Sequence, residues 1–262
     1  MKLILRTLLV SSLVLASAAV ATSDRSVAHN AALKRSSIKE PAAVKGRNLD
    51  EDTKVKDTLE SLIDLIFKER KVRDAFARYF LFSNLSSEQK RMIDPTSLHY
   101  SDEVAALDAG TVARIFSTGW DYEYQSVVLA LGMKPLSDFE EAVEQAGSEV
   151  DNERKRILRK RGLSEEDFYT LLDRKAVKDR KLLENELTTL ELINADIDRF
   201  IAQRTNHAVL SQNLLEMKTS LSINKVNRAG CVVYAVKIKP IFTVVFIQEH
   251  HGAKMISFGD TH

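Results

Sequence analysis

Apolar residues recur every three or four positions along the middle of the chain, which is the spacing of one face of an amphipathic helix. Three such stripes are Val55, Leu59, Leu62, Ile63 and Ile66; Val72, Phe76, Tyr79 and Phe80; and Leu183, Leu187, Leu190, Ile197 and Ile201. Polar residues fill most of the positions between the members of each stripe, so each predicted helix buries one face. We therefore expect a multi-helix bundle over residues 53–205.

Glycine, proline and capping residues indicate where these helices begin and end. Two short helices in the first half should be bounded by Gly110, Gly119 and Gly132-Met133-Lys134-Pro135. Ser137 is a candidate N-cap for the next helix, which should end at Gly162. Ser164-Glu165-Glu166-Asp167 is a capping-box sequence and predicts the start of another helix.

The C-terminal extension, residues 206–262, has a different pattern. Residues 231–236 and 241–247 are dense in Val, Ile, Phe and Tyr, and lysines together with Pro240 separate them. They predict two strands, with residues 255–258 as a candidate third. The expected fold class is therefore mainly α, a helical bundle followed by a short C-terminal β-hairpin. A two-stranded ribbon is marginal in water, so it must pack on the bundle or pair with a partner.

The first residues predict a secretory signal peptide. Lys2 and Arg6 precede an apolar stretch over residues 8–20, and Ala19-Val20-Ala21 supplies the small residues that a signal peptidase accommodates. This stretch is too short to cross about 30 Å of hydrocarbon, which argues against an integral membrane span. We expect cleavage after Ala21, so that residues 1–21 are removed.

A polar arm follows the predicted signal peptide. Residues 22–46 are rich in Ser, Ala, Lys and Arg and contain no aromatic residue, so they bury too little apolar surface to offset their ordering entropy. We expect a disordered arm over residues 22–52, with transient contact to anionic lipid. It ends in Arg47-Asn48-Leu49-Asp50-Glu51-Asp52, which a receptor or protease could read. Alternatively, the three acids cap the following helix and complement its dipole.

The order of these segments resembles that of oomycete RxLR-dEER effectors. Arg47 and Leu49 match the first motif, Asp50 stands where the family has its second Arg, and the acids follow at once. The resemblance implies that residues 47–52 are a translocation motif. It also implies that the protein enters a host plant cell, binds host proteins and suppresses immunity-associated cell death. Arg47-x-Leu49-x-Glu51 also fits the Arg-x-Leu-x-Glu export pattern of malaria parasites.

The body resembles, in part, the WY fold that is common in these effectors. Residues 162–168 with Leu171 resemble the opening helix of that fold, and residues 181–185 resemble a later stretch of the same unit. The family's signature Trp is not found directly before Gly162. The single tryptophan of the chain, Trp120, lies in the preceding segment.

Composition and cysteine content bear on the destination. The chain has 262 residues, a net charge of +1 and one cysteine, Cys231. The balanced charge gives no global basic field, and we expect no specific nucleic-acid partner. With one cysteine the chain forms no internal disulfide, so its stability must come from a packed interior. This suits a reducing destination, the host cytoplasm or nucleus, although an extracellular helical domain of this size can also do without disulfides.

Residues with catalytic or metal-binding chemistry are scattered. The six histidines show no metal-ligand spacing on a common helix face, and the adjacent His250 and His251 would point to opposite faces of a strand. Cys231 lies in an apolar run that disfavours a thiolate, so we interpret it as a core residue. We expect no metal, no cofactor and no enzyme activity, although distant residues can still assemble an active site.

The densest cluster of bases is Arg154-Lys155-Arg156-Ile157-Leu158-Arg159-Lys160-Arg161. It is a candidate nuclear-import signal for an import receptor, or a contact for phosphates or anionic lipids. With equal weight, the bases favour the dipole of a helix C-terminus, and Glu149, Asp151 and Glu153 are placed to pair with them.

Asn84-Leu85-Ser86 is a sequon for N-glycosylation, so Asn84 is a candidate glycan site if the chain passes through a secretory pathway. Together these features predict a secreted pathogen effector that acts inside the host cell, in the nucleus and cytoplasm, by binding host proteins. The alternatives are a secreted enzyme with a non-contiguous active site and an extracellular helical protein with a structural or adhesive role.

Overall fold

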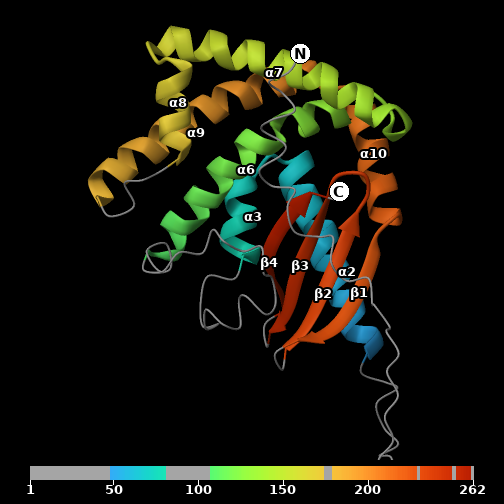
Figure 1. The fold of residues 1–262 in the computed structure, drawn as a ribbon. Coiled ribbons are helices and arrows are strands. Elements are labelled where there is room, and N and C mark those ends of the chain that lie inside the picture. Colours follow the sequence, from blue (N-terminus) through green and yellow to red (C-terminus); the bar gives the residue numbers. More distant parts are fainter. Residues whose placement is uncertain (1–47, 81–106, 174–178, 229–230, 250–251, 261–262) are drawn as a thin grey trace, which may run out of the picture.

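The computed structural model describes residues 48–80, 107–173, 179–228, 231–249 and 252–260 of the chain. The predicted signal peptide, the arm up to Arg47 and the sequon at Asn84 lie outside these residues. The described chain is mainly helical, with an antiparallel sheet of four strands at its C-terminal end (Figure 1). The expected fold class is confirmed, and the predicted hairpin forms the middle of a larger sheet.

The helices follow the apolar stripes of the sequence. The described α-helices are α2 (Asn48–Ile63), α3 (Val72–Tyr79), α6 (Ala109–Leu131), α7 (Phe139–Arg161), α8 (Glu165–Asp173), α9 (Arg180–Arg204) and α10 (His207–Thr219). A π-helical turn, η1 (Asp64–Lys68), continues α2, and a 3₁₀ turn, η2 (Leu136–Asp138), precedes α7. The stripe from Val55 to Ile66 is buried along its whole length, as its spacing predicts. Among the described helices, none combines the length and apolarity needed to cross a bilayer.

The sheet is a meander in which each strand pairs with the next. Its strands are β1 (Ser222–Arg228), β2 (Cys231–Ile238), β3 (Phe242–Glu249) and β4 (Gly252–Asp260), and all neighbours are antiparallel. Pro240 follows a cis peptide bond in the turn between β2 and β3, where the Ile241 amide donates to the Ile238 carbonyl at 2.9 Å. At the edge of the sheet that β4 forms, Phe80 makes a single parallel bridge with Met255.

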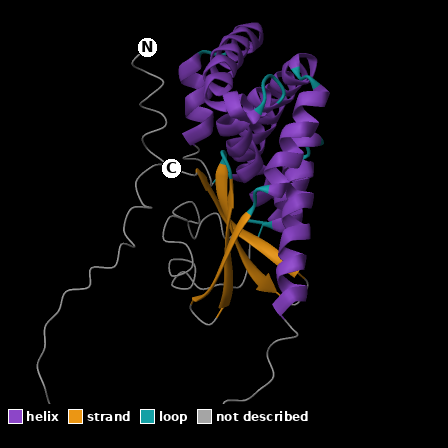
Figure 2. Cartoon of the chain, turned by 90° about the vertical axis from the view of Figure 1, so that its right-hand side faces the viewer, coloured by secondary structure: helices purple, strands orange, loops and turns teal. Residues whose placement is uncertain are grey.

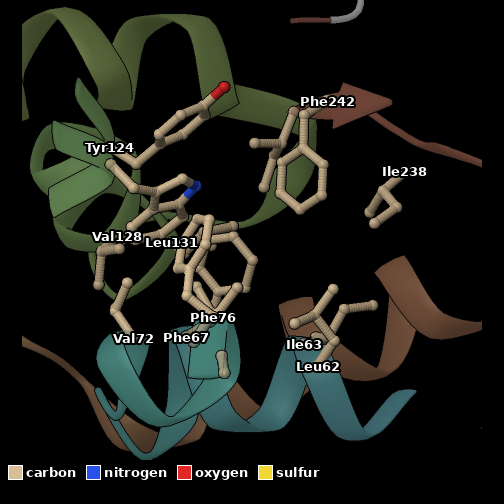
Figure 3. Packing of buried hydrophobic residues seen from close by; sticks show 14 of the residues in the cluster. Leu62, Ile63, Phe67, Val72, Phe76, Tyr124, Val128, Leu131, Ile238 and Phe242 are labelled. Atoms are coloured by element: carbon tan, nitrogen blue, oxygen red, sulfur yellow. The ribbon is translucent and has the colours of Figure 1, made fainter. Parts of the chain in front are cut away.

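One hydrophobic core joins the sheet to the helices. The sheet lies along one side of the helices, and α2 runs behind it in the first view (Figures 1 and 2). Phe242 of β3 stacks on Phe67 of η1 with ring centroids 5.8 Å apart, and Phe67 meets Trp120 of α6 edge-on at 5.8 Å. Ile238 and Leu62 lie beside this aromatic group (Figure 3). The extension is therefore packed on the bundle and shares its interior.

The structure differs from the sequence-based expectation at Gly119. The chain continues as one helix, α6, through Gly119, where two short helices were expected. A glycine inside a helix costs about 1 kcal/mol relative to alanine, and the burial of neighbours such as Trp120 and Val112 outweighs that cost. Farther along, the predicted N-cap at Ser137 is wrong: Ser137 lies in the 3₁₀ turn η2, and Asp138 is the residue that precedes α7. Helix α7 ends before Gly162 as expected, and Gly162 has the left-handed φ of 70° that favours glycine.

Two elements of the extension were not expected, and one boundary lies elsewhere. Helix α10 and strand β1 fall between the predicted bundle and the predicted ribbon. Strand β1 has the sequence SINKVNR, in which polar residues alternate with Ile223 and Val226 only in part, so its apolar signal is weak. Helix α2 begins at Asn48, so residues 48–52 of the expected arm are helical.

Candidate functional site

A shallow open cleft of about 220 Å³ lies where the start of α3 meets the middle of α6 and of α9. Its polar walls come from three elements far apart in sequence, and they include Arg70, Ser117, Thr118, Asp121, Asn194 and Asp198. The first stripe of apolar residues ends in η1, and α3 begins a few residues later. Arg70 lies in the short link between them, where it contacts Asp121 of α6 and Asp198 of α9.

Arg70 is held in the cleft by its side chain. Its φ of 55° lies in the left-handed region, which costs a non-glycine residue roughly 1–2 kcal/mol. Its guanidinium donates to the Ile66 carbonyl at 3.2 Å, to Asp198 at 2.5 Å and to Asp121 at 3.3 Å. These charge-assisted bonds offset the backbone cost. The Nε atom of Arg70 is buried and has no hydrogen-bond partner within the part of the chain that the structure describes.

Asp121 has the most perturbed carboxyl in the cleft. Burial raises the pKa of Asp121 from its ordinary 3.8 to about 7, because desolvation disfavours the charged carboxylate. The positive charge of Arg70 opposes this shift and the nearby Asp198 adds to it. Arg70 thus forms ion pairs with two carboxylates, and Asp198 lies closer to it than Asp121 does. A carboxyl that titrates near neutral pH can take up or release a proton there, which is the property of a general acid or base.

A buried polar network continues from this cleft into the interior. Gln125 of α6 donates to the Oδ1 atom of Asn194 at 3.2 Å, and Asn194 donates to the Thr118 carbonyl at 3.3 Å. Arg154 of α7 donates to the Oε1 atom of Gln125 at 3.2 Å. The network ties α6, α7 and α9 to one another, since buried polar groups must find partners.

A second ionic contact fixes α9 against α6. Arg114 donates two hydrogen bonds to Glu191, at 2.7 and 2.9 Å, and one to Glu184 at 2.5 Å. The hydrogen bonds to Glu191 raise the pKa of Arg114 above its ordinary value. This fork pairs planar guanidinium with planar carboxylate, so it sets the register of the two helices as well as holding them together.

The structure divides the predicted basic run over 154–161 among different surroundings. Arg154 is buried, and its guanidinium lies 4.8 Å from the ring centroid of Tyr122. The sequence-based prediction that Arg154 is available to an import receptor is therefore wrong. Among the others, Arg156 pairs with Glu153, Lys155 with Glu165, and Arg161 with Asp196. Arg159 and Lys160 are exposed on the last turn of α7. A receptor would therefore meet a rigid helix with its bases on several faces.

The predicted translocation motif lies at the edge of the described chain. Arg47 lies outside it, and Asn48, Leu49, Asp50 and Glu51 form the first turn of α2. Asp52 is exposed and accepts a hydrogen bond from Lys225 of β1 at 3.5 Å. The predicted motif from Asn48 onward is therefore part of α2.

Other sequence-based candidates are placed only in part. Cys231 is the first residue of β2, and His207 is exposed at the first position of α10. Within the described ranges, no three His, Cys, Asp or Glu side chains come together to hold a metal ion. Sequence reasoning missed the group of Arg70, Asp121 and Asp198. No local signal marks these residues, because they are separated by long stretches of chain and meet only through the packing of three helices.

Comparisons with known proteins found no match: no protein-family model, no curated protein and no solved structure is similar to this chain.

Proposed function

We propose that this protein is a secreted pathogen effector that enters a host plant cell, binds host proteins there and suppresses immunity-associated cell death. The observation that carries the proposal is the order of segments. An apolar leader with a small-residue exit precedes a polar arm, then Arg47-x-Leu49 with adjoining acids, then a helical body. This is the layout of oomycete RxLR-dEER effectors.

The helical body supports a role inside a reducing compartment. Its interior is one continuous apolar cluster from α2 to the sheet, and it includes the aromatic group around Phe67, Trp120 and Phe242. Stability of this kind needs no disulfide, and the chain has one cysteine only. A protein built in this way keeps its fold after transfer from an oxidising secretory route to a host cytosol.

The test is expression of residues 22–262 inside leaf cells that are then exposed to a cell-death trigger. Electrolyte leakage measures the death response, and an unrelated helical protein at equal abundance is the control. We expect lower leakage with residues 22–262 than with the control. Equal leakage at matched protein levels rejects the proposal.

A secreted enzyme is the second candidate, and the observation that favours it is the cleft around Asp121. Desolvation raises the pKa of Asp121 to about 7, and the carboxyl lies beside Arg70 and Asp198 in an open depression. This is the condition in which a carboxyl exchanges protons efficiently at neutral pH.

One substitution separates the two candidates. Asp121→Asn keeps the size of the side chain and a carbonyl oxygen for Arg70, but it removes the titrating group. If the protein acts by binding, Asp121→Asn suppresses leakage as well as the wild type does. Loss of suppression by a variant with wild-type abundance and melting temperature favours the enzyme.

A further inference from the structure

Helices α7 and α9 run antiparallel and share an exposed seam that is lined by arginines from both. Glu149 lies 3.9 Å from Arg204 at one end of this seam, and Arg161 lies 2.5 Å from Asp196 toward the other end. Arg156 and Lys160 follow Glu149 on the same face of α7, and Arg199 follows Asp196 on α9. We call this surface the arginine seam: Glu149, Glu153, Arg156, Lys160, Arg161, Asp196, Arg199 and Arg204.

The bases of the arginine seam stand outside its acids. The side chains of Arg156, Arg199 and Arg204 are 66%, 72% and 60% exposed, whereas Glu153, Asp196 and Glu149 are 13%, 21% and 28% exposed. A partner approaching this face therefore meets guanidinium groups first. The acids lie beneath them and hold their positions.

The acids do not neutralise the seam. Asp196 alone accepts hydrogen bonds from both Arg161 and Arg199. Glu153 accepts two from Arg156, which lower the pKa of Glu153, so this acid stays ionised and keeps Arg156 in place. Five bases stand against three acids on the seam, so a net positive charge remains. An arginine whose fork is already oriented loses less entropy when it binds a further carboxylate.

We propose that the arginine seam binds an acidic segment of a host protein, rich in Asp and Glu, laid along the line of exposed bases on α7 and α9. Residues 149–160 span about 16 Å at about 1.5 Å per residue. An extended acidic segment of about five residues covers that length at about 3.3 Å per residue. Its carboxylates match the planar guanidinium forks of Arg156, Arg161 and Arg199. The identification of the partner as a host protein rests on the proposed function. The binding of an acidic segment does not depend on that function.

An acidic peptide fits this surface better than an anionic membrane does. A membrane presents negative charge over a broad plane, whereas the exposed bases of the arginine seam follow the line of two helices. Its attraction is worth only about 1 kcal/mol per base near the surface. Leu192 is exposed next to Arg161, whereas Phe200 is half-buried with the Arg204 guanidinium over its ring. One leucine offers little area for insertion into lipid.

The binding test uses residues 22–262 and a fluorescein-labelled peptide of alternating Glu and Ser, followed by fluorescence anisotropy at low salt. Arg156→Gln with Arg199→Gln removes two exposed bases whose partners lie on their own helices, so the α7–α9 contact stays intact. The matched control is Lys56→Gln with Lys71→Gln. It removes the same charge from two exposed lysines that also pair locally, with Glu60 and Glu69.

We expect the wild type to bind the peptide and the seam variant to bind it about tenfold more weakly, with the control within about twofold of the wild type. Glu149→Gln adds net positive charge to the seam and should tighten binding, an effect that damage to the fold cannot produce. If the melting temperature of the seam variant is well below that of the wild type, the affinity of Glu149→Gln for the peptide tests the proposal instead.

Three results overturn the proposal. They are equal binding by the seam variant and the control, equal wild-type binding to a peptide with Gln in place of Glu, and binding to phosphatidylserine vesicles without binding to the peptide. The leaf-cell assay keeps the two proposals distinct. A seam variant that loses the peptide but still suppresses leakage removes the seam from the function and leaves the effector proposal standing.

Discussion

The guanidinium of Arg154 donates a hydrogen bond to the side-chain oxygen of Gln125 at 3.2 Å, in the interior between α6 and α7. Arg154 also pairs with Asp151 at 2.6 Å and lies over the ring of Tyr122. A residue that opens the densest basic run of the sequence is thus part of the core. The helices of this protein are aligned by a polar network as well as by apolar packing.

Gln125→Ala should lower the free energy of unfolding by about 2–3 kcal/mol, because it leaves buried groups of Arg154 and Asn194 without their partner. The measurement is urea unfolding followed by circular dichroism. Gln145→Ala is the control, since Gln145 is exposed on α7 and its loss should cost less than about 0.5 kcal/mol. Equal stability of the two variants would show that the network contributes nothing.

Gly119 inside α6 and Gly132 just after its end should respond to alanine with opposite signs. A Cβ on Gly132 would lie 2.6 Å from the Cγ2 atom of Thr205, so Gly132→Ala should destabilise the protein by about 1–3 kcal/mol. A Cβ on Gly119 meets nothing within 4 Å, so Gly119→Ala should stabilise it by about 0.5–1 kcal/mol. Melting temperatures of the two variants check this, and a shift of the same sign in both contradicts it.

Stability should depend on pH through Asp121. Burial raises its pKa from 3.8 to about 7, so between these values the folded chain binds more protons than the unfolded chain. The free energy of unfolding must then fall as pH rises through this window. In Asp121→Asn this contribution is absent. We expect the stability of the wild type minus that of the variant to fall from about pH 4 to about pH 7.

Urea unfolding at several pH values provides the comparison. Groups far from Asp121 contribute equally to both chains and cancel in the difference. Parallel pH profiles for the wild type and Asp121→Asn would mean that the folded-state pKa of Asp121 is ordinary.

Strands β2 and β3 should exchange their amide hydrogens only when the whole protein unfolds. Phe242, Val244 and Phe246 are fully buried against the helices, so the sheet cannot open without exposing the common core. Phe242→Ala should destabilise the sheet and the helices together by about 3–5 kcal/mol, and Thr243→Ala is the milder control on the same strand. Rapid exchange throughout β2 and β3, with protected helices, would contradict a shared core.

The sequence predicted those elements whose signals are local. The stripes led by Val55 and Leu183 predicted the buried faces of α2 and α9, and the Ser164 capping box is present, with Ser164 and Asp167 bonded to each other's amides. The apolar runs on either side of Pro240 are β2 and β3. In each case the residues that make the pattern also make the contact.

The sequence could not predict features that depend on distant partners. Gly119 interrupts the helical pattern, yet tertiary packing carries α6 through it. Arg154 looks like its basic neighbours, and only the placement of Gln125 and Tyr122 makes it a core residue. The same holds for Asp121 and Asp198, whose meeting with Arg70 requires the packing of three elements.

The central claim is that this protein acts inside the host cell, and comparing two compartments tests it most directly. Residues 22–262 are expressed in the leaf-cell cytosol, and the same residues are expressed behind a signal peptide with a C-terminal ER-retention sequence. Both carry Asn84→Gln, so that no glycan at this position separates them. We predict that leakage after a cell-death trigger falls only with the cytosolic form. Equal suppression by the retained form, or suppression by neither, would contradict the account.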